Sequence, residues 1–551
     1  MTRAAQLTLL FAALTVVMAA PWSLHPTTRI LVDNPDAHLF MWTLGWDAHA
    51  FISQPLSIFD ANIYHPLPNT LAYSENLIGS AMLVAPIVWA TNDLLLALNL
   101  ASMLACGLSG IGAYVLGRKV GLSPASAIIT GIVFAFAPSR FFRMSQMHVN
   151  AMQWMPFGLA YLHAYFDRGR ARDLRIALGF LVMQAITVGH GAVFLGVAML
   201  ALAAYRLARG EPLAPLRRLR DVGLIGAMLT VPAILIWLPY RRAQEEMGLR
   251  RSLENWTVTP ESFFASPTHV HQFVMSLLTD RNLNETASAF LFPSYLVLLL
   301  GIVALWPARG AGNAEPDATP NIRRNVVFYG LLAGLSVLFF IDGPLSLWPW
   351  VYSWPGFSFI RVPSRFMILT TLTLAVLAGA GFERLAARAT GRGMLVGATL
   401  LAAALLGEFA TQPFSGTPYA IRIPSIVRWL DTLPKPFVVA EVPVPRARTA
   451  GAYVRFNTAA MLHSTVHWQK TIHGYSGLEP ALHARVLGEL NLFPNEASIA
   501  SLKELGVTHV VVHRPLYAPD EWPDVESRLR QSVDLRFVHA EADGEVYEIL
   551  K

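Results

Sequence analysis

Long apolar runs separated by short polar segments fill the first three quarters of the chain. A helix that crosses a membrane needs roughly 20 mostly apolar residues, and somewhat fewer where it is locally short. Apolar runs of this kind fall near 4–24, 93–117, 122–138, 149–166, 174–188, 190–207, 222–240, 291–307, 326–341, 366–382 and 394–412. The pattern predicts a mainly α-helical polytopic membrane domain over residues 1–412, with about 11 transmembrane helices.

A further apolar run, 76–91, does not fit a simple alternation of spans. The basic residues of the later loops, such as Arg118 and Lys119, collect on one side of the membrane only if this run does not cross it. We therefore interpret 76–91 as a re-entrant or interfacial segment that is broken by Pro86. The positive-inside rule then places the N-terminus in the cytoplasm and the C-terminal region outside.

The pattern changes to that of a water-soluble domain after Pro413. Alternating and buried-type apolar segments predict helices over 426–433, 481–490 and 498–505, strands over 437–442 and 507–513, and a hairpin of 535–540 with 545–550 around Asp543-Gly544. We expect residues 413–551 to form a small α/β domain, periplasmic in a bacterial cell.

Composition narrows the class of protein. The 551 residues are 54% hydrophobic and only 14% charged, whereas a soluble domain carries about 25% charged residues. The net charge of +6 does not indicate a nucleic-acid partner, because most of the Arg falls in short loops that the positive-inside rule explains. The single cysteine, Cys106, cannot form an intramolecular disulfide, and no Cys/His pattern of a metal site is present.

The predicted topology gathers the polar loops on the outer face, and the first of them, 25–75, holds the acids Asp33 and Asp36. A carboxylate at the membrane surface can act as general base on a lipid-borne substrate. Asp36 is equally suited to cap the amphipathic helix predicted over 37–51, because Asp is a favoured N-cap residue. Asp47 lies eleven residues further on, and we interpret it as a solvated position of an interfacial helix.

Several motifs are spread over residues 30–515. They are Asp36 with Trp42 and Gly45-Trp-Asp-Ala-His49, Phe59-Asp-Ala-Asn-Ile-Tyr-His-Pro66, Leu71-Ala-Tyr-Ser-Glu75, Met147-His148 with Gln153-Trp-Met-Pro156, Leu291-Phe-Pro293, Arg361-Val-Pro-Ser-Arg365, Ser464-Thr-Val-His467-Trp468, Gly474-Tyr-Ser-Gly477 and Leu505-Gly-Val-Thr-His-Val-Val-Val-His513. With these motifs the chain resembles a family of bacterial polytopic proteins related to the GT-C glycosyltransferases.

The resemblance implies a membrane glycosyltransferase with a polyprenyl-phosphate-linked sugar as donor. It implies an inverting single displacement at the outer face onto a lipid, glycan or protein acceptor. The catalytic base of such enzymes lies in the first outer loop, where Asp36 matches and Asp33 is the alternative. Related enzymes often carry two adjacent acids, whereas this chain reads Asp33-Asn-Pro-Asp36.

The departing phosphate needs positive charge or hydrogen-bond donors. Arg is a natural bidentate phosphate ligand, and the candidates are Arg140, Arg143, Arg361 and Arg365. The alternative for the Arg361/Arg365 pair is an interaction with lipid head groups at the membrane surface.

Three further polar residues border apolar runs on the outer side. Glu75 could be a second acid, or could contact a metal or a substrate hydroxyl. His148 and His190 could contact substrate, since polar residues entering a span usually face the bundle interior or a wet cavity. The alternatives are that Glu75 is an interfacial carboxylate exposed to solvent and that His148 forms an interhelical hydrogen bond. For His190 the alternative is a tight Gly189-His190-Gly191 turn.

A polar and aromatic stretch in the tail contains His467, Trp468 and Tyr475. Such residues suit contact with a carbohydrate or a lipid head group. The alternative is an ordered loop that packs the C-terminal domain against the membrane region. No metal ligands are assigned; a divalent ion is compatible with the reaction but not required by it.

Two other functions remain open. A lipid or glycan transporter should show repeated broken spans in both halves, and no such repeat is found. A non-catalytic scaffold of envelope glycan assembly would keep the fold without needing Asp36. We expect an enzyme in the bacterial plasma membrane whose partners are the bilayer, a lipid-linked sugar and its acceptor, with no nucleic acid.

Overall fold

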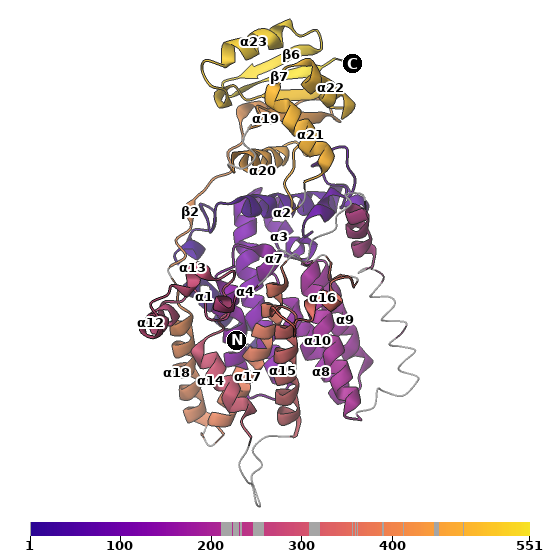
Figure 1. The fold of residues 1–551 in the computed structure, drawn as a ribbon. Helices are drawn as coiled ribbons and strands as arrows, with labels where there is room; N and C mark the ends of the chain where they lie inside the picture. Colours follow the sequence, from indigo (N-terminus) through magenta and orange to yellow (C-terminus); the bar gives the residue numbers. More distant parts are fainter. Residues whose placement is uncertain are drawn as a thin grey trace, which may run out of the picture. The chain divides into compact units, whose positions relative to one another are not determined.

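The structure is a computed structural model that describes residues 2–210, 223, 231, 234–245, 258–307, 320–354, 356–358, 360, 362–387, 389, 391–411, 413–445, 451–477 and 479–550. The chain divides into two compact units (Figure 1). Unit 1 comprises Met1–His25, Leu100–Ile236 and Arg250–Ser415, and unit 2 comprises Pro26–Asn99, Trp237–Leu249 and Gly416–Lys551. The division passes through one continuous helix, α4 (Leu94–Lys119).

Unit 1 is helical over its described residues. Besides most of α4, its helices are α1 (Arg3–Met18), α5 (Pro124–Phe136), α6 (Pro138–Phe141), α7 (Met147–Asn150), α8 (Trp154–Arg168), α9 (Ala171–Ala185), α10 (Gly189–Ala208), α12 (His269–Leu278), α13 (Leu283–Thr286), α14 (Tyr295–Leu305), α15 (Pro320–Leu338), α16 (Trp348–Val351), α17 (Met367–Leu385) and α18 (Gly391–Phe409). Short 3₁₀ turns lie at Trp22–Leu24, Pro260–Phe263 and, as η6, at Pro363–Phe366.

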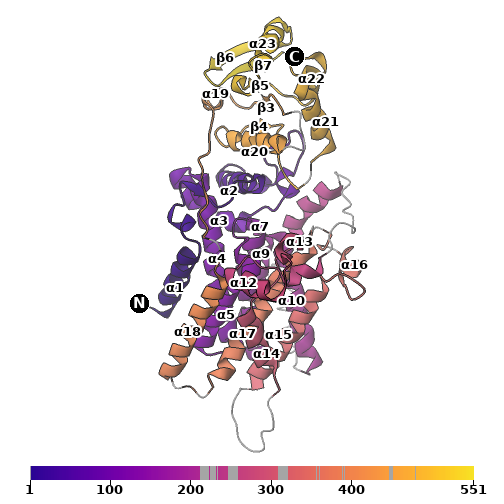
Figure 2. The same cartoon turned by 60° about the vertical axis from the view of Figure 1, so that its left-hand side comes forward.

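Helix α17 is the central helix of unit 1 and contacts α5, α14 and α15 (Figure 2). Its residues are buried on almost every side, which its nearly unbroken apolar sequence permits. Gly381 allows α14 to approach closely, because a Cβ atom at this position would lie 2.1 Å from the carbonyl oxygen of Leu300. Small residues at such contacts are the usual means of helix association in membranes.

Five of the described helices are long and apolar enough to cross a membrane. They are Leu94–Lys119, Pro124–Phe141, Gly189–Ala208, Pro363–Leu385 and Gly391–Phe409. Arg3–Met18, Ile78–Thr91 and Tyr295–Leu305 are shorter apolar helices. The chain is thus a mostly helical, membrane-embedded protein, while the count of 11 spans stays a prediction, and most of the run 222–240 lies outside the described residues.

In unit 2 the first loop forms α2 (Pro35–Ser53) and 3₁₀ turns at Pro55–Ser57 and Thr70–Tyr73, and the apolar segment that follows it forms α3 (Ile78–Thr91). The prediction that Pro86 breaks the segment 76–91 is wrong, since α3 continues through this proline. The 14 residues of α3 are fewer than a full span requires.

The rest of unit 2 is built around a five-stranded sheet of order β4-β3-β5-β7-β6. Its strands are β3 (Val438–Val442), β4 (Lys470–Thr471), β5 (His509–Val512), β6 (Leu535–Glu541) and β7 (Gly544–Ile549). The helices around it are α19 (Ser425–Leu430), α20 (Ala452–Ser464), α21 (Ala481–Glu489), α22 (Glu496–Glu504) and α23 (Trp522–Gln531), and two further short strands, β1 (Arg29–Ile30) and β2 (Thr417–Pro418), pair with each other. Strand β3 is parallel to both β4 and β5, whereas β5, β7 and β6 are antiparallel.

Alternation along the central strands separates two apolar layers. Ala440 and Val442 of β3 face one layer, which includes residues of α20, α21, α22 and α23, whereas Val439 faces the layer formed with α19. Glu441 therefore points to the α19 side of the sheet.

The edge strand β4 is covered by the first loop. Backbone hydrogen bonds join Thr471 N–H to the Asn62 carbonyl at 2.8 Å and Tyr64 N–H to the His473 carbonyl at 3.1 Å. Gly474 is needed for this contact, because a Cβ atom there would lie 2.5 Å from the Tyr64 ring. Covering the edge satisfies backbone groups that would otherwise be free to pair with another chain.

The predicted elements of the tail fall close to the observed ones. The strand predicted over 437–442 corresponds to β3, and the hairpin around Asp543-Gly544 corresponds to β6 and β7. The division into domains 1–412 and 413–551 stays a prediction; by contacts, the last segment of unit 2 begins at Gly416. Residues 26–99, however, group with the C-terminal region and not with the helical region to which the sequence assigned them.

Candidate functional site

The first turn of α2 carries the acid predicted as catalytic base. Asn34 is the N-cap, because its side chain accepts from Ala37 N–H at 2.9 Å, and Pro35 occupies the first helical position. The prediction that Asp36 caps this helix is therefore wrong. Asp36 lies in the first turn, where the positive end of the helix favours a negative charge.

The Asp36 carboxylate is oriented by a residue from the far end of the chain. The Tyr475 hydroxyl donates to Asp36 Oδ1 at 3.0 Å, and Asp36 remains partly exposed. Two residues that the sequence suggested for different roles are thus in direct contact within unit 2. The bond fixes one carboxylate oxygen and leaves the group accessible, as a general base requires.

Asp33, the alternative base, is exposed and paired with a histidine. Asp33 Oδ1 lies 2.9 Å from His38 Nε2, and the other ring nitrogen of His38 lies 3.1 Å from the Thr458 hydroxyl on α20. Burial lowers the pKa of His38, and the nearby Asp33 only partly offsets this effect. His38 thus links the first loop to α20. We call Asp33, Asp36, His38 and Tyr475 the acid turn.

A third carboxylate on α2 differs from the prediction. Asp47 is 0% exposed, and neither of its oxygens has a hydrogen-bond partner among the described residues. Burial raises the pKa of Asp47 well above its usual range, because it disfavours the charged carboxylate. The interpretation of Asp47 as a solvated surface position is wrong.

Glu75 lies between the 3₁₀ turn Thr70–Tyr73 and α3 and is partly buried. The neighbouring Asn76 donates through both its backbone and its side chain to the Tyr240 hydroxyl, at 3.0 Å each. The charge of Glu75 acts on the same tyrosine. The role of Glu75 stays a prediction.

The tail residues His467 and Trp468 are held by other protein groups. Trp468 stacks on His49 of α2 with ring centroids 4.5 Å apart, and it also contacts Trp46 at 6.1 Å. His467 is buried, and its Nδ1 accepts from Gln469 N–H at 3.0 Å. Burial lowers the pKa of His467 to about 4. These contacts agree with the alternative of an ordered loop, whose packing partner in unit 2 is α2.

In unit 1, Arg140 has a structural environment. Its guanidinium donates to the carbonyls of Phe134, Ala135 and Asn150, to the Asn150 side chain and to the Ser109 hydroxyl, at 2.7 to 3.3 Å. Arg140 is 1% exposed. A guanidinium with this set of protein acceptors has little capacity left for a phosphate.

Four other predicted contacts come together in unit 1. The rings of His148 and His190 have centroids 6.4 Å apart, and the charges of Arg143 and Arg365 act on His148. Arg365 belongs to η6 at the start of α17, and His190 to the first turn of α10. These four residues form what we call the cationic cluster, in which the two arginines carry the positive charge that suits an anion. Arg361 lies outside the described residues.

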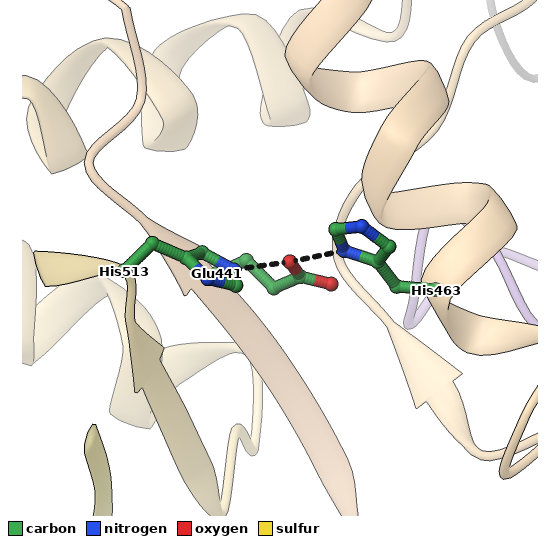
Figure 3. Close-up of side chains that lie close together, drawn as sticks. All are labelled: Glu441, His463 and His513. Carbon is green, nitrogen blue, oxygen red and sulfur yellow. Dashed lines mark hydrogen bonds and ion pairs between the residues drawn. The ribbon is translucent and has the colours of Figure 1, made fainter. Parts of the chain in front are cut away.

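A group that the sequence analysis missed lies at the sheet of unit 2. Glu441 Oε2 lies 2.7 Å from His463 Nδ1 and 2.6 Å from His513 Nε2 (Figure 3). Burial disfavours the charged carboxylate, but the two rings outweigh this effect and hold the pKa of Glu441 well below its usual range. Burial likewise opposes the charged His463 ring, yet Glu441 raises the pKa of His463. The signal available in the sequence is an acid inside a buried strand and a histidine at the end of another.

No protein-family model and no curated protein sequence matches the chain. Among solved structures, the whole chain matches 40% of the arabinofuranosyltransferase AftD from Mycobacteria, with a TM-score of 0.57 and 13% identity. The oligosaccharyltransferase AglB from Archaeoglobus fulgidus matches with a TM-score of 0.47 and 13% identity, over 98% of this chain and 74% of that one. ArnT from Cupriavidus metallidurans, bound to undecaprenyl phosphate, matches with a TM-score of 0.47 and 15% identity, over 98% and 97%.

The matches define the fold class. The chain has the fold of GT-C-type membrane glycosyltransferases, as the motifs of the sequence suggested. AftD carries this comparison, since the other two structures have lower TM-scores. The chain spans less than half the length of AftD, and identity this low is evidence of fold and not of activity.

Proposed function

We propose that this protein is an integral-membrane glycosyltransferase that transfers a sugar from a polyprenyl-phosphate donor to a lipid, glycan or protein acceptor. The fold match over the whole chain supports the class of enzyme. The observation that carries the reaction is Asp36, an accessible carboxylate in the first outer loop that Tyr475 orients. The setting is the bacterial plasma membrane, with the N-terminus in the cytoplasm and a C-terminal α/β domain outside.

The reaction is a single displacement with inversion at the anomeric carbon. Asp36 takes the proton of the acceptor hydroxyl while the acceptor oxygen forms its bond to the anomeric carbon. The bond from that carbon to the phosphate oxygen breaks, and its electron pair leaves with the polyprenyl phosphate. Asp33 is the alternative base, and it would have to give up its contact with His38.

The cationic cluster is the proposed contact of the donor phosphate. Arg143 and Arg365 supply permanent positive charge, and His148 and His190 supply ring N–H donors. Stabilising the charge that develops on the leaving phosphate lowers the barrier of such a transfer. Arg140 is left out, because both of its terminal nitrogens already donate to protein acceptors and its side chain is buried.

The test is complementation of a deletion strain at matched membrane expression. Wild type, Asp36→Asn, Asp33→Asn and, as a control on the same helix, Asp47→Asn are compared by mass spectrometry of envelope glycans and lipid-linked sugars. We expect the deletion to accumulate a truncated glycan that wild type and Asp47→Asn restore. We expect Asp36→Asn to leave the glycan truncated, and the missing sugar then identifies the donor.

The other outcomes favour the other functions. If Asp36→Asn restores the profile and Asp33→Asn does not, the base is Asp33. If both restore it, the protein acts without a first-loop base, as a scaffold or a transporter would. Purified protein in detergent separates these two readings from an enzyme, because only an enzyme transfers the sugar where no membrane divides donor from acceptor.

A further inference from the structure

The Glu441 cluster lies where α/β sheets commonly bind ligands. The chain leaves β3 for its neighbour β4 on one side and later returns to β5 on the other side. Strand order therefore reverses between β3 and β5, and ligands bind preferentially outside the carboxyl ends of parallel strands at such a point. Glu441 is near the carboxyl end of β3, and His513 directly follows β5.

The three side chains converge from three different elements. Glu441 comes from β3 and His463 from the last turn of α20, while His513 is joined to β3 by its backbone N–H, which donates to the Val442 carbonyl at 2.8 Å. One ligand atom from each of the three lies within 4.8 Å of the other two. Both imidazole rings turn a nitrogen toward the same carboxylate oxygen (Figure 3).

We propose that Glu441, His463 and His513 bind one Zn²⁺ ion. Two imidazole nitrogens and one carboxylate oxygen are a ligand set that Zn²⁺ uses in proteins, with a fourth position left for water. Mg²⁺ and Ca²⁺ prefer oxygen ligands only, so the two nitrogens disfavour them. The proposal does not depend on the proposed glycosyltransferase function.

The surroundings fit a metal ligand. The ring of His463 also donates to the backbone carbonyl of Arg422, and metal-bound histidines usually donate their second N–H to such an acceptor. The backbone N–H of Glu441 donates to His473 Nε2 at 2.8 Å, and His473 Nδ1 lies 2.9 Å from the Asn457 side chain. This second layer of bonds holds the carboxylate-bearing strand in place.

Entry of an ion requires a path and a small expansion. The His463 side chain is 12% exposed, whereas Glu441 is almost fully buried, so the ion would enter past His463. The present nitrogen-to-oxygen distances of 2.6 and 2.7 Å are those of hydrogen bonds. Ligands of a tetrahedral Zn²⁺ stand roughly 3.4 Å apart, so each ring must move outward by a fraction of an ångström.

Bound Zn²⁺ would clamp the end of α20 onto the sheet. Helix α20 also carries Thr458, which contacts His38 of the acid turn. The ion would thus stabilise α20, which contacts the first-loop acid Asp33 through His38. It would not contact the substrate.

The test uses the full-length protein in detergent, purified without a polyhistidine tag and stripped with EDTA. Zinc is titrated by calorimetry, and bound metal is counted by mass spectrometry after dialysis. Wild type, Glu441→Gln and His513→Asn are compared with His539→Asn. His539 is a matched control, since it forms a histidine–carboxylate pair with Glu541 at 3.0 Å in the same unit, at a more exposed position.

We expect one zinc ion per wild-type and His539→Asn chain, and at least about 100-fold weaker binding in the other two variants. Cobalt substitution of wild type should give visible absorption bands of a four-coordinate site, so the result does not depend on the variants folding. The proposal is overturned if stripped wild type binds no zinc, or if Glu441→Gln binds zinc as tightly as wild type.

Discussion

Unit 2 contains two carboxylate–histidine centres that are built in opposite ways. In the acid turn, Asp33 is exposed and contacts His38, and Asp36 is partly exposed and accepts a hydrogen bond from Tyr475. In the Glu441 cluster, the carboxylate is 3% exposed and lies between two imidazole rings. The same residue types therefore give one accessible carboxylate and one carboxylate enclosed by two imidazole rings.

The largest expected effect is a loss of transfer activity when the acid turn is changed and the Glu441 cluster is left intact. Asp36→Asn should lower the transfer rate of the purified protein by about 100-fold to 10,000-fold, because a general base contributes this much. Its zinc content and melting temperature should stay at the wild-type values. The measurement is a transfer assay with a synthetic polyprenyl-phosphate sugar. If Asp36→Asn retains activity within a few-fold of wild type, Asp36 is not the general base.

The second prediction concerns stability at the closed centre. Glu441→Gln should destabilise the β3–β5 region by about 3 kcal/mol, because it leaves two buried imidazoles without their anion. Hydrogen exchange followed by mass spectrometry should show faster exchange of the β3 and β5 amides in this variant. Exchange in α17 of unit 1 is the internal control. Unchanged protection of β3 would mean that the cluster contributes nothing to the sheet.

The third prediction concerns how the buried histidine His483 makes the stability of the folded protein depend on pH. Burial lowers the pKa of His483 to about 4, and its Nε2 bonds to the His65 carbonyl at 3.0 Å. The unfolded chain takes up a proton near pH 6.5, so stability should fall as pH drops from about 6.5 to about 4, by up to about 3 kcal/mol. Below pH 4 this contribution is fully lost.

The measurement for His483 is the melting temperature between pH 7 and pH 4.5. His467 also has a pKa lowered to about 4, so the wild-type curve reports more than one group. His483→Gln should have a flatter curve than wild type, and the difference isolates His483. Parallel curves would show that His483 is protonated in the folded protein as easily as in the unfolded chain.

The fourth prediction tests what Tyr475 does for Asp36. Tyr475→Phe removes one hydrogen bond to the carboxylate and should lower kcat about tenfold, which corresponds to roughly 1.4 kcal/mol. KM for the acceptor should change little, since Tyr475 positions the base and does not bind the substrate in this interpretation. A large rise in KM with unchanged kcat would instead assign Tyr475 to the acceptor site.

The smallest expected effect is at Asp47, which has neither the access of Asp36 nor the partners of Glu441. Burial raises the pKa of Asp47 because it disfavours the charged carboxylate, and Asn has a similar shape without that charge, so Asp47→Asn should change stability by less than about 1 kcal/mol. Activity should also be retained. Loss of transfer in a folded Asp47→Asn protein would assign the general base to Asp47, in the middle of α2, and not to Asp36 in its first turn.

Local features of this chain follow from its sequence. The apolar runs predict the long helices, and β3, β6 and β7 lie where β-branched residues and the Asp543-Gly544 turn place them. Helix α20 was missed, because its polar and apolar residues show no clear period and its sequence leads into a polar stretch. The local pattern of apolar and polar residues predicts helices and strands more readily than it predicts the environment of a single side chain.

The candidate sites depend on contacts that no local pattern contains. The place of Asp36 after the first span makes it a candidate base, but its partner Tyr475 is 439 residues away in the sequence. Asp47 looked solvated because a carboxylate usually is, whereas tertiary packing around α2 buries it completely. Glu441 and the two histidines lie on separate elements, so their meeting depends on strand order, which the sequence alone did not reveal.

The grouping of residues 26–99 with 416–551 has a consequence for biosynthesis. The first loop leaves the ribosome hundreds of residues before the segments that contact it, with separations of 402, 418 and 439 residues for the Asn62–Ser464, His65–His483 and Asp36–Tyr475 contacts. Contacts of such high sequence separation form late. The first loop therefore stays incompletely packed while unit 1 is inserted into the membrane, and the acid turn is completed only after the segment that carries Tyr475 has been synthesised.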